Sequence, residues 1–483
     1  MIDNKTVPEI PEGLIEGKVE GYHYFLNPQG YHGVLVLFGD ALDVFNLCRR
    51  RFEFGEMVSA LPWAKNNVER VEQILNELGK MKLIRLGKDY SEKFQAERRK
   101  STKKIMAVWL QLTDACNLRC EYCCIKKKPT RMGIDMAKKL VEKIVIDSDR
   151  NGFEEVLVKI VGGEPMLFWA DAKALIDWAE IRFANLELRV RFHIITNGTL
   201  LAQTFIDYIL QERVGISVSL DGVGKWHDVQ RPYVNGNGSF KKVDANISKL
   251  LTEGINFNIL AVITKKNVSG LTELAKYCLE RNLAFRFGFY RDIPTFLGEI
   301  DVDNKNLIRE LKKCYSWIGQ NLPEKNLQSL HKLADIRLNG PKVRNCGIGY
   351  NSLTVGHDGS VSICQYEMEV SLGNVLESDA IRLVTDQKHY DLDGTRVNQV
   401  PGCRDCEWRY TCGGGCPLLT KQHFGEMRRS SPYCEVYKTI LPVLVELNAL
   451  QLVKRFQKKQ KSQGILTERK GGEKNGRVGN SLR

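Results

Sequence analysis

Apolar runs typical of buried strands alternate with helical patterns over residues 105–290. Strands are expected at Ile105–Leu112, Val156–Val161, Val190–Thr196, Gly215–Leu220, Phe257–Thr264 and Ala284–Tyr290. The intervening helices are expected at Ile134–Ile146, Ala170–Phe183, Leu201–Gln211, Phe240–Leu251 and Leu271–Arg281. Such repetition predicts a parallel sheet with right-handed crossovers, so the chain is expected to be an α/β protein with its chemistry on the loops that follow the strands.

Three cysteines lie on the loop that leaves the first of these strands. Cys116, Cys120 and Cys123 have the spacing C-x3-C-x2-C. Three thiolates on one short loop can hold three irons of a [4Fe–4S] cluster and leave the fourth iron open to another ligand. Zinc is the alternative occupant, but three cysteines alone would leave it one ligand short.

This spacing, with Tyr122 before the last cysteine, resembles the radical SAM superfamily. The resemblance implies a partial (β/α)6 TIM-like barrel over residues 105–300 and a [4Fe–4S] cluster whose open iron binds S-adenosylmethionine (SAM). Reductive cleavage of SAM would give a 5′-deoxyadenosyl radical that abstracts hydrogen from a substrate. The cofactor would carry that step, and the protein would supply position and dryness.

Later motifs match the same superfamily at the ends of the following strands. Gly162-Gly163-Glu164-Pro165 resembles the stretch that receives the SAM amino group, and Thr196-Asn197-Gly198 resembles a turn near the cofactor, although a plain turn is an alternative. The resemblance assigns SAM contacts to Tyr122, Gly162, Gly163, Glu164, Thr196, Asn197, Ser219 and Arg231. His227 is interpreted as a packing or capping histidine.

A second group of cysteines lies in a glycine-rich region near the C-terminus. Its spacing, C-x12-G-x4-C and then C-x2-C-x5-C-x3-C-x17-C, resembles the SPASM extension of radical SAM proteins over residues 346–440. The resemblance implies two auxiliary [4Fe–4S] clusters. One would be held by Cys403, Cys406, Cys412 and Cys434, and the other by Cys346, Cys364 and Cys416 with an open iron or a distant ligand such as Cys314. Zinc ribbons are the alternative.

The remaining cysteines carry no cluster assignment. Cys48, Cys278 and Cys314 stand in apolar or helical surroundings typical of buried thiols, and Cys124 falls outside the loop spacing.

Residues 14–90 are predicted to form a small separate domain. Two strands, Val19–Leu26 and Gly33–Phe38, precede three helices. This order resembles the PqqD-like winged-helix domain, which implies binding of a leader peptide at a strand edge; a winged helix that only packs on the enzyme is the alternative. A linker is expected over residues 91–104, and a helical bridge over residues 301–345 with helices at Leu307–Ile318 and Leu327–Leu338.

The C-terminal residues 441–483 are expected to form a terminal helix and a basic, disordered tail. Residues 454–483 account for +8 of the net charge of +13, so the charge does not indicate nucleic-acid binding. No apolar run is long enough for a membrane helix and no signal peptide is evident, so a cytoplasmic protein without a membrane partner is expected.

Together these features predict a radical SAM/SPASM maturase that acts on a peptide or protein. The expected partners are a precursor peptide or protein and a low-potential electron donor such as flavodoxin or ferredoxin. The expected reaction is an oxidation such as thioether or carbon–carbon cross-linking. A sulfatase maturase, a peptide epimerase or excision enzyme, and a non-catalytic binding protein are the alternatives.

The catalytic base cannot be named from the sequence. In sulfatase maturases an aspartate follows the cysteine of G-x4-C, but here that position is Gln365, whose amide cannot take a proton. Glu367 and Glu369 are candidates for a relocated base.

Overall fold

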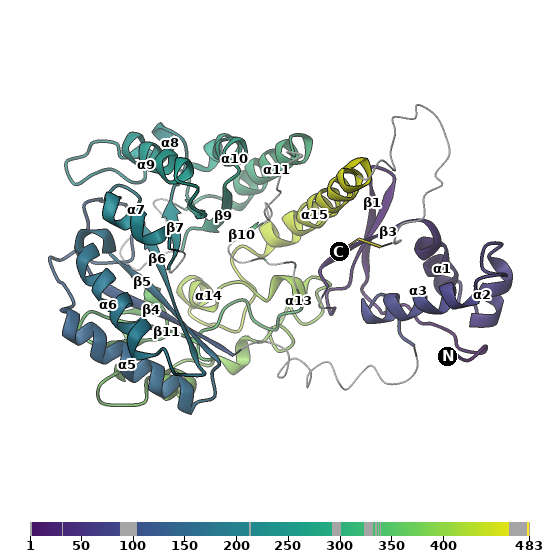
Figure 1. Ribbon diagram of the computed structural model, residues 1–483, viewed down its shortest axis with the longest axis horizontal. Coiled ribbons are helices and arrows are strands. Elements are labelled where there is room, and N and C mark those ends of the chain that lie inside the picture. Colours follow the sequence, from purple (N-terminus) through teal and green to yellow (C-terminus); the bar gives the residue numbers. More distant parts are fainter. Residues whose placement is uncertain are drawn as a thin grey trace.

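The computed structural model describes residues 2–30, 32–86, 104–211, 214–291, 301–322, 332–333, 336, 338, 340–462 and 481–482. The predicted linker therefore lies almost wholly outside the described residues. Two bodies are visible in Figure 1, a large α/β body and a smaller one that contains the N-terminus, with α15 (Cys434–Ser462) running between them.

The large body is built on a sheet whose six central strands are parallel and neighbour one another in sequence order. They are β4 (Ile105–Thr113), β5 (Glu155–Gly162), β6 (Arg189–Thr196), β7 (Val214–Ser219), β8 (Asn258–Ile263) and β9 (Ala284–Phe289). All six match the predicted strands to within one or two residues. The predicted α/β fold with a partial six-stranded barrel is therefore confirmed.

Helices connect and cover these strands (Figure 1). They are α5 (Ile134–Arg150), α6 (Trp169–Arg182), α7 (Gln203–Ile209), α8 (Lys225–Asp228), α9 (Phe240–Thr252) and α10 (Leu271–Glu280), with short 3₁₀ turns η1 (Pro165–Phe168) and η2 (Val268–Gly270). Along β6, β8 and β9, buried residues alternate with half-buried or exposed ones, so one face of the sheet packs in the core.

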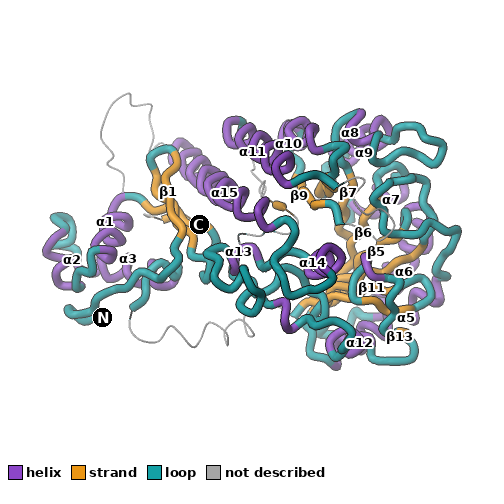
Figure 2. Tube along the Cα trace, turned by 180° about the vertical axis from the view of Figure 1, so that it is seen from behind, coloured by secondary structure: helices purple, strands orange, loops and turns teal. Residues whose placement is uncertain are grey.

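The cysteine-rich region extends the same sheet beyond its first strand. β11 (Ser352–Val355) pairs parallel to β4, and β12 (Ser360–Ser362) and β13 (Gly373–Asn374) continue antiparallel. The other elements are short: η3 (Gln365–Glu367), α12 (Ala380–Thr385), η4 (Asp393–Thr395), α13 (Arg409–Cys412) and α14 (Pro417–Phe424). Much of this region is loop, as Figure 2 shows.

The predicted helical bridge is only partly helical. α11 (Asn304–Gln320) confirms its first helix. The second helix, predicted at Leu327–Leu338, is wrong where the structure describes it, because Lys332 and Leu333 form the strand β10 beside β9. A short apolar run can serve either as strand or as helix, and here the open edge of β9 provides a strand partner.

The N-terminal body has three antiparallel strands, one more than the two predicted, followed by the three helices expected from the sequence. They are β1 (Ile15–Val19), β2 (Tyr22–Leu26), β3 (Val34–Leu37), α1 (Gly39–Arg49), α2 (Phe54–Ala60) and α3 (Val68–Lys80). A fourth strand, β14 (Ser481–Leu482), pairs with β3, so this part of the predicted disordered tail is a strand.

α15 fills the other face of the N-terminal sheet. Leu35 and Leu37 of β3 pack with the α1–α3 helices, whereas Val34 and Val36 belong to the main core together with the apolar residues of α15. Of the described helices, α15 alone is long and apolar enough to cross a membrane, but 61% of its apolar window is buried inside the protein.

Candidate functional site

The loop after β4 brings together the three cysteines of the C-x3-C-x2-C motif. Burial is the main cause that raises the pKa of the Cys120 thiol to about 11, and the nearby Cys123 acts in the same direction. Burial and the same Cys123 thiol also raise the pKa of Cys116. The three thiols are therefore neighbours, as the sequence predicts.

Backbone contacts from a distant segment hold this loop in place. The Arg119 N–H donates to the Pro232 carbonyl at 2.8 Å, and Leu118, which is fully buried, bridges to Tyr233. The Cys116 sulfur accepts from the Leu118 N–H at 3.4 Å. The loop is thus fixed between β4 and the region after β7.

The two glycines of Gly162-Gly163-Glu164-Pro165 allow close backbone packing. A Cβ at Gly162 would lie 2.3 Å from the Thr113 carbonyl oxygen, and one at Gly163 would lie 2.1 Å from that of Ala115. Gly163 and Glu164 also donate backbone hydrogen bonds to Thr113 and Ala115. The glycines therefore shape the start of the cysteine loop, a role that the sequence analysis did not anticipate.

Glu164 joins the ends of β5 and β6. Its carboxylate is fully buried and accepts from Met166 N at 3.0 Å, from the Thr196 hydroxyl at 2.7 Å and from Asn197 N at 2.7 Å. Burial raises the pKa of Glu164 to about 7, against the opposing effect of these donors. The side chain is occupied by protein partners, as are the backbone N–H groups of Gly163 and Glu164.

The Thr196-Asn197-Gly198 turn contacts the cysteine loop directly. The Asn197 side-chain amide donates to Asn117 Oδ1 at 2.9 Å and lies 3.9 Å from the Cys116 sulfur. Asn117 in turn donates to Thr199 at 2.8 Å. A hydrogen bond to a ligand sulfur is one of the means by which proteins tune an iron–sulfur cluster.

A buried carboxylate that the sequence analysis missed lies at the end of β7. Asp221 accepts from Arg231 Nε at 2.7 Å and from Arg231 Nη2 at 3.3 Å, and it also accepts from the Tyr122 hydroxyl and the Val262 N–H. The Arg231 guanidinium lies 5.3 Å from the Tyr122 ring centroid. Tyr122 and Arg231, which were both predicted to contact SAM, therefore lie close together. Both of them bind the carboxylate of Asp221.

His227 supports this ion pair from behind. Its Nδ1 accepts from the Asp221 N–H at 3.3 Å, and its Nε2 lies 3.0 Å from the Ser239 hydroxyl. Ser239 then donates to the Arg231 carbonyl at 2.6 Å. The interpretation of His227 as a packing histidine agrees with this arrangement.

Ser219 ends β7, two residues before Asp221, and is buried. Its position places it at the same edge of the sheet as Asp221 and Glu164. The predicted SAM contacts thus gather at the carboxyl ends of β4 to β7, on four neighbouring strands.

The thiols near the C-terminus form two sets. Burial and then the neighbouring Cys416 and Cys364 raise the pKa of Cys346 to about 12. Burial and then the neighbouring Cys403 and Cys434 raise the pKa of Cys412 to about 12, and Cys403 also neighbours Cys406. These are the two ligand sets expected from the resemblance.

Two other cysteines occupy different surroundings. Cys314 is buried in α11, where its sulfur lies 3.6 Å from the Leu271 carbonyl oxygen and neighbours Cys278. It is packed against α10, and its electrostatic neighbours do not include the Cys346 set, so the suggestion that it is a distant ligand is not supported. Cys124 instead neighbours Cys123 and Cys364.

The cysteine loop and the cysteine-rich region therefore face each other. Lys126 forms an ion pair with Glu369, and the pKa of Cys124 is raised by burial and then by Cys123 and Cys364. The Arg291 guanidinium, just after β9, lies 5.5 Å from the ring centroid of Tyr366. One side of the barrel mouth is thus closed by residues 364–369.

The donor chemistry of these sets fits iron–sulfur clusters. All fourteen cysteines are free thiols, and ten of them fall into the three sets. Burial raises the pKa of several of these thiols, among them Cys120, Cys346 and Cys412, so cluster assembly would release protons from them. Among the described residues, no three His, Cys, Asp or Glu side chains lie close enough together to surround a single ion.

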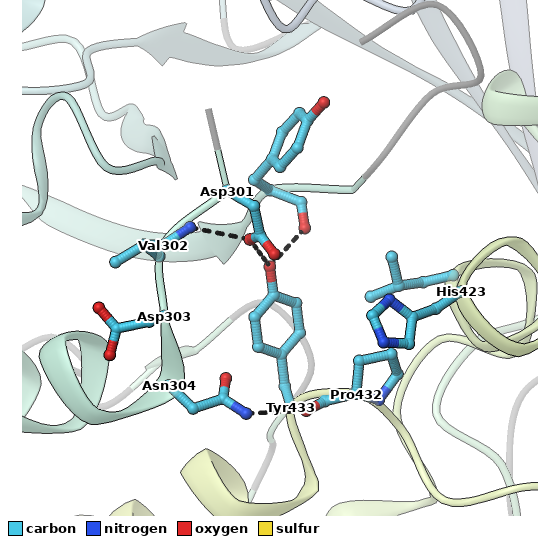
Figure 3. A pocket seen from close by; sticks show the side chains of 9 residues that line it. Asp301, Val302, Asp303, Asn304, His423, Pro432 and Tyr433 are labelled. Carbon is cyan, nitrogen blue, oxygen red and sulfur yellow. Dashed lines mark hydrogen bonds between the residues drawn. The ribbon is translucent and has the colours of Figure 1, made fainter. Parts of the chain in front are cut away.

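A separate pocket of about 200 Å³ lies where β9, α11 and α14 meet (Figure 3). The Tyr433 hydroxyl donates to the Tyr290 carbonyl at 2.9 Å and lies 3.2 Å from Asp301 Oδ1. His423 of α14 lines the opposite side in Figure 3. Asp301, His423 and Tyr433 carry no sequence motif, and the sequence analysis did not single them out.

Two family models match the chain. The radical SAM superfamily model matches residues 110–278, and the SPASM iron–sulfur cluster-binding domain matches residues 346–407. These matches cover the barrel and the first part of the cysteine-rich region.

Curated relatives are similar over most of their own length. A cysteine-type anaerobic sulfatase-maturating enzyme of Clostridium novyi is 24% identical over 345 residues, 67% of this chain and 91% of the relative. The antilisterial bacteriocin subtilosin biosynthesis protein AlbA of Bacillus subtilis is 23% identical over 313 residues, 63% of this chain and 65% of the relative.

Solved structures share the fold. The anaerobic sulfatase-maturating enzyme anSMEcpe, with bound AdoMet and a peptide, has a TM-score of 0.56 at 19% identity, covering 72% of this chain and 99% of that one. Streptococcus suis SuiB bound to its precursor peptide SuiA has a TM-score of 0.52 at 16% identity, covering 89% of this chain and 100% of that one.

The radical SAM domain implies a [4Fe–4S] cluster with SAM, and the SPASM domain implies auxiliary iron–sulfur clusters. The grouping of the thiols, the parallel strands behind them and both family models all indicate these two domains. The chain therefore contains a radical SAM domain and a C-terminal SPASM domain, and it is an enzyme.

Proposed function

We propose that this enzyme is a maturase that abstracts hydrogen from a peptide or protein and leaves an oxidative modification, such as a thioether or carbon–carbon cross-link. The observation that carries the proposal is the contact between the two cysteine regions, where Cys364 neighbours Cys124 and Lys126 pairs with Glu369. It brings an auxiliary cluster set to the mouth of the barrel. A redox centre there could take up the electron that an oxidised substrate gives back.

The proposed ligands of the SAM-binding cluster are Cys116, Cys120 and Cys123. A [4Fe–4S] cluster held there, with SAM bound, would supply one-electron reduction and radical hydrogen abstraction. Asn197 donates toward the Cys116 sulfur, and the buried Asp221–Arg231 pair fixes Tyr122 over the site. An exposed ion pair between Lys126 and Glu369 links this loop to the cysteine-rich region.

The auxiliary clusters are proposed to use the two C-terminal thiol sets. Cys403, Cys406, Cys412 and Cys434 provide four ligands for one cluster, and Cys346, Cys364 and Cys416 provide three for the other. Neither Glu367, which accepts from the Tyr390 hydroxyl at 3.2 Å, nor Glu369, which pairs with Lys126, is free of protein partners. A relocated base at these positions would have to give up those contacts.

The N-terminal body is proposed to recognise the substrate peptide. The SuiB likeness spans 89% of the chain, more than the barrel and the cysteine-rich region contain, so the similarity in fold extends into this body. An extended peptide could add to the edge of β3. We further propose a cytoplasmic location and a low-potential electron donor such as flavodoxin or ferredoxin.

A sulfatase maturase remains the second candidate because curated relatives carry that name. Against it, Gln365 stands directly after Cys364, where a base would be needed, and begins the short turn η3. A cysteine- or serine-containing peptide from a sulfatase, incubated with the enzyme, distinguishes the two. Formylglycine formation would favour this candidate over cross-linking.

Reductive SAM cleavage tests the radical chemistry itself. Anaerobically reconstituted enzyme with dithionite and SAM is expected to release 5′-deoxyadenosine even without substrate. The Cys123→Ala variant should release none, whereas Cys48→Ala, a buried thiol of the N-terminal body, should behave as the wild type. Failure of the wild type to cleave SAM would instead indicate a protein with purely structural clusters.

A further inference from the structure

The strand β3 has little surface left for a partner except one edge. Val34, Leu35, Val36 and Leu37 are all buried, because the α1–α3 helices cover one face and α15 covers the other. One edge of β3 pairs with β2 along four residues, His23–Leu26 opposite Val34–Leu37. The opposite edge is where a further strand can be added.

The chain's own C-terminus occupies that opposite edge. Ser481 pairs with Leu37 and Leu482 with Val36, in antiparallel register. Figures 1 and 2 both place the C-terminus beside this sheet, although the two segments lie far apart in the sequence. The strand covers only part of β3, because no pairing partner for Val34 or Leu35 is found on this side among the described residues.

We propose that β14 is a resident, displaceable cap on the β3 edge, and that an extended substrate peptide must displace it to bind. The second half of this proposal rests on the proposed function of the N-terminal body. An unpaired strand edge readily accepts another strand, so an internal cap protects it when no substrate is present. The ligand class is an extended peptide backbone, recognised by main-chain hydrogen bonds.

The small size of β14 makes displacement feasible. A two-residue strand contributes few ladder bonds, each stabilising by about 1 kcal/mol net. A peptide paired along all of β3 would form more such bonds. Because β14 is covalently connected to α15, it stays near the edge of β3. It can therefore compete with a peptide for this edge even when its own affinity for the edge is low.

Hydrogen exchange of β3 amides tests the cap without any substrate. Neighbouring amides of a strand point to opposite edges, so of Val36 and Leu37 one N–H faces β14 and the other faces β2. In a chain ending at Ser462, the amide facing β14 is expected to exchange roughly five- to tenfold faster, as the loss of about 1 kcal/mol implies. The amide facing β2 is the internal control and should not change.

Proline variants of the full-length chain distinguish loss of the strand from other effects of truncation. Ser481→Pro and Leu482→Pro each remove one N–H, and one of the two must face β3. At least one proline variant should therefore reproduce the faster exchange. Ser481→Ala and Leu482→Ala keep the backbone donors and are the matched controls.

A peptide of residues 473–483 added to the truncated chain completes the test. It should restore slow exchange at the β14-facing amide, whereas a scrambled peptide should not. Unchanged exchange on truncation, or faster exchange that the peptide fails to reverse, would overturn the proposal. Because no step involves SAM, the cap can stand even where SAM cleavage fails.

Discussion

Asp221 is the residue on which the barrel mouth depends most. Its carboxylate is fully buried and is shared by Arg231, Tyr122 and two donors near β8. A buried ion pair adds little net stability, but removal of one partner leaves an uncompensated charge. The effect of a substitution here should therefore be large and specific.

The Asp221→Asn variant is expected to lower the free energy of unfolding by about 3–5 kcal/mol, because Arg231 stays charged and loses its partner. Urea titration followed by tryptophan fluorescence measures the change. Adding Arg231→Met to the same variant should recover part of the loss. A stable single variant would show that water or another group already neutralises Arg231.

His227 predicts a pH dependence. Burial, and then the charge of Arg231, lowers its pKa from 6.5 to about 3. The neutral ring is therefore favoured in the folded state, and its stabilising contribution is complete above pH 6.5 and is lost as the pH falls from 6.5 toward 3.

The His227→Gln variant has no imidazole to titrate, so its stability should not fall for this reason as the pH is lowered. Between pH 7.5 and 5.5 the wild type should lose about 1.4 kcal/mol relative to the variant. Paired urea titrations at the two pH values measure the difference, in which effects common to both proteins cancel. A constant difference between the proteins would mean that His227 titrates normally in the fold.

At the scale of single residues, the sequence shows residue types and their spacing, but it does not show which side chains bind each other in the fold. The cysteine loop and Arg231 are evident because their spacing is fixed along the chain. Asp221 lies in the same run as Ser219 and was passed over, since nothing in the sequence says that Arg231 is paired internally. Likewise Glu164 is identifiable, yet its three protein donors depend on how β5 and β6 meet.

At the scale of elements, the β5 turn and the cysteine loop form one packed unit. Gly163 approaches Ala115 so closely that no side chain fits, and this approach sets the path of the chain toward Cys116. The glycines of the motif are therefore required by packing between two loops.

Gly163→Ala should disturb the cysteine loop, because its Cβ would lie 2.1 Å from the Ala115 oxygen. Overpacking of this kind costs about 1–3 kcal/mol or more. Iron content after reconstitution should fall by about four atoms per chain, the content of one cluster. Gly133→Ala is the matched control, with nothing within 4 Å of the new Cβ and an ordinary φ of −68°; equal iron contents would contradict the argument.

The regular elements were the most predictable part of the chain. The six strands carry apolar residues in short runs or at alternate positions and follow each other in the sheet, so local pattern and topology agree. β10 and β14 were not predicted because each has two residues and exists only where a long-range neighbour offers an edge. No local pattern encodes such an edge.

At the scale of the whole molecule, α15 connects the two bodies. It begins at Cys434, a proposed cluster ligand, and its far end packs on the N-terminal sheet, where Phe456 lies 4.8 Å from Phe38 and 6.5 Å from Tyr22 between ring centroids. The domain boundary predicted at residue 441 falls inside this helix. Apolar spacing along a helix does not show which distant surface the helix covers, so the sequence did not reveal that α15 contacts both bodies.

The Phe456→Ala variant should loosen the N-terminal body without unfolding the barrel. Truncation of a half-buried aromatic side chain is expected to weaken this contact by about 1–3 kcal/mol. Limited proteolysis should then cut more quickly between residues 86 and 104, while SAM cleavage stays near the wild-type rate. Unchanged proteolysis would mean that other contacts hold the two bodies together.

The path of α15 also has a consequence for biosynthesis. The N-terminal sheet leaves the ribosome before the barrel does, but the apolar face formed by Val34 and Val36 is covered by a helix that is made after the cysteine-rich region. At the usual pace of translation, this face would wait for several hundred residues before its partner appears. The nascent chain must therefore carry an exposed apolar surface while the barrel and the cysteine-rich region are made, which makes this sheet a natural place for a chaperone to bind.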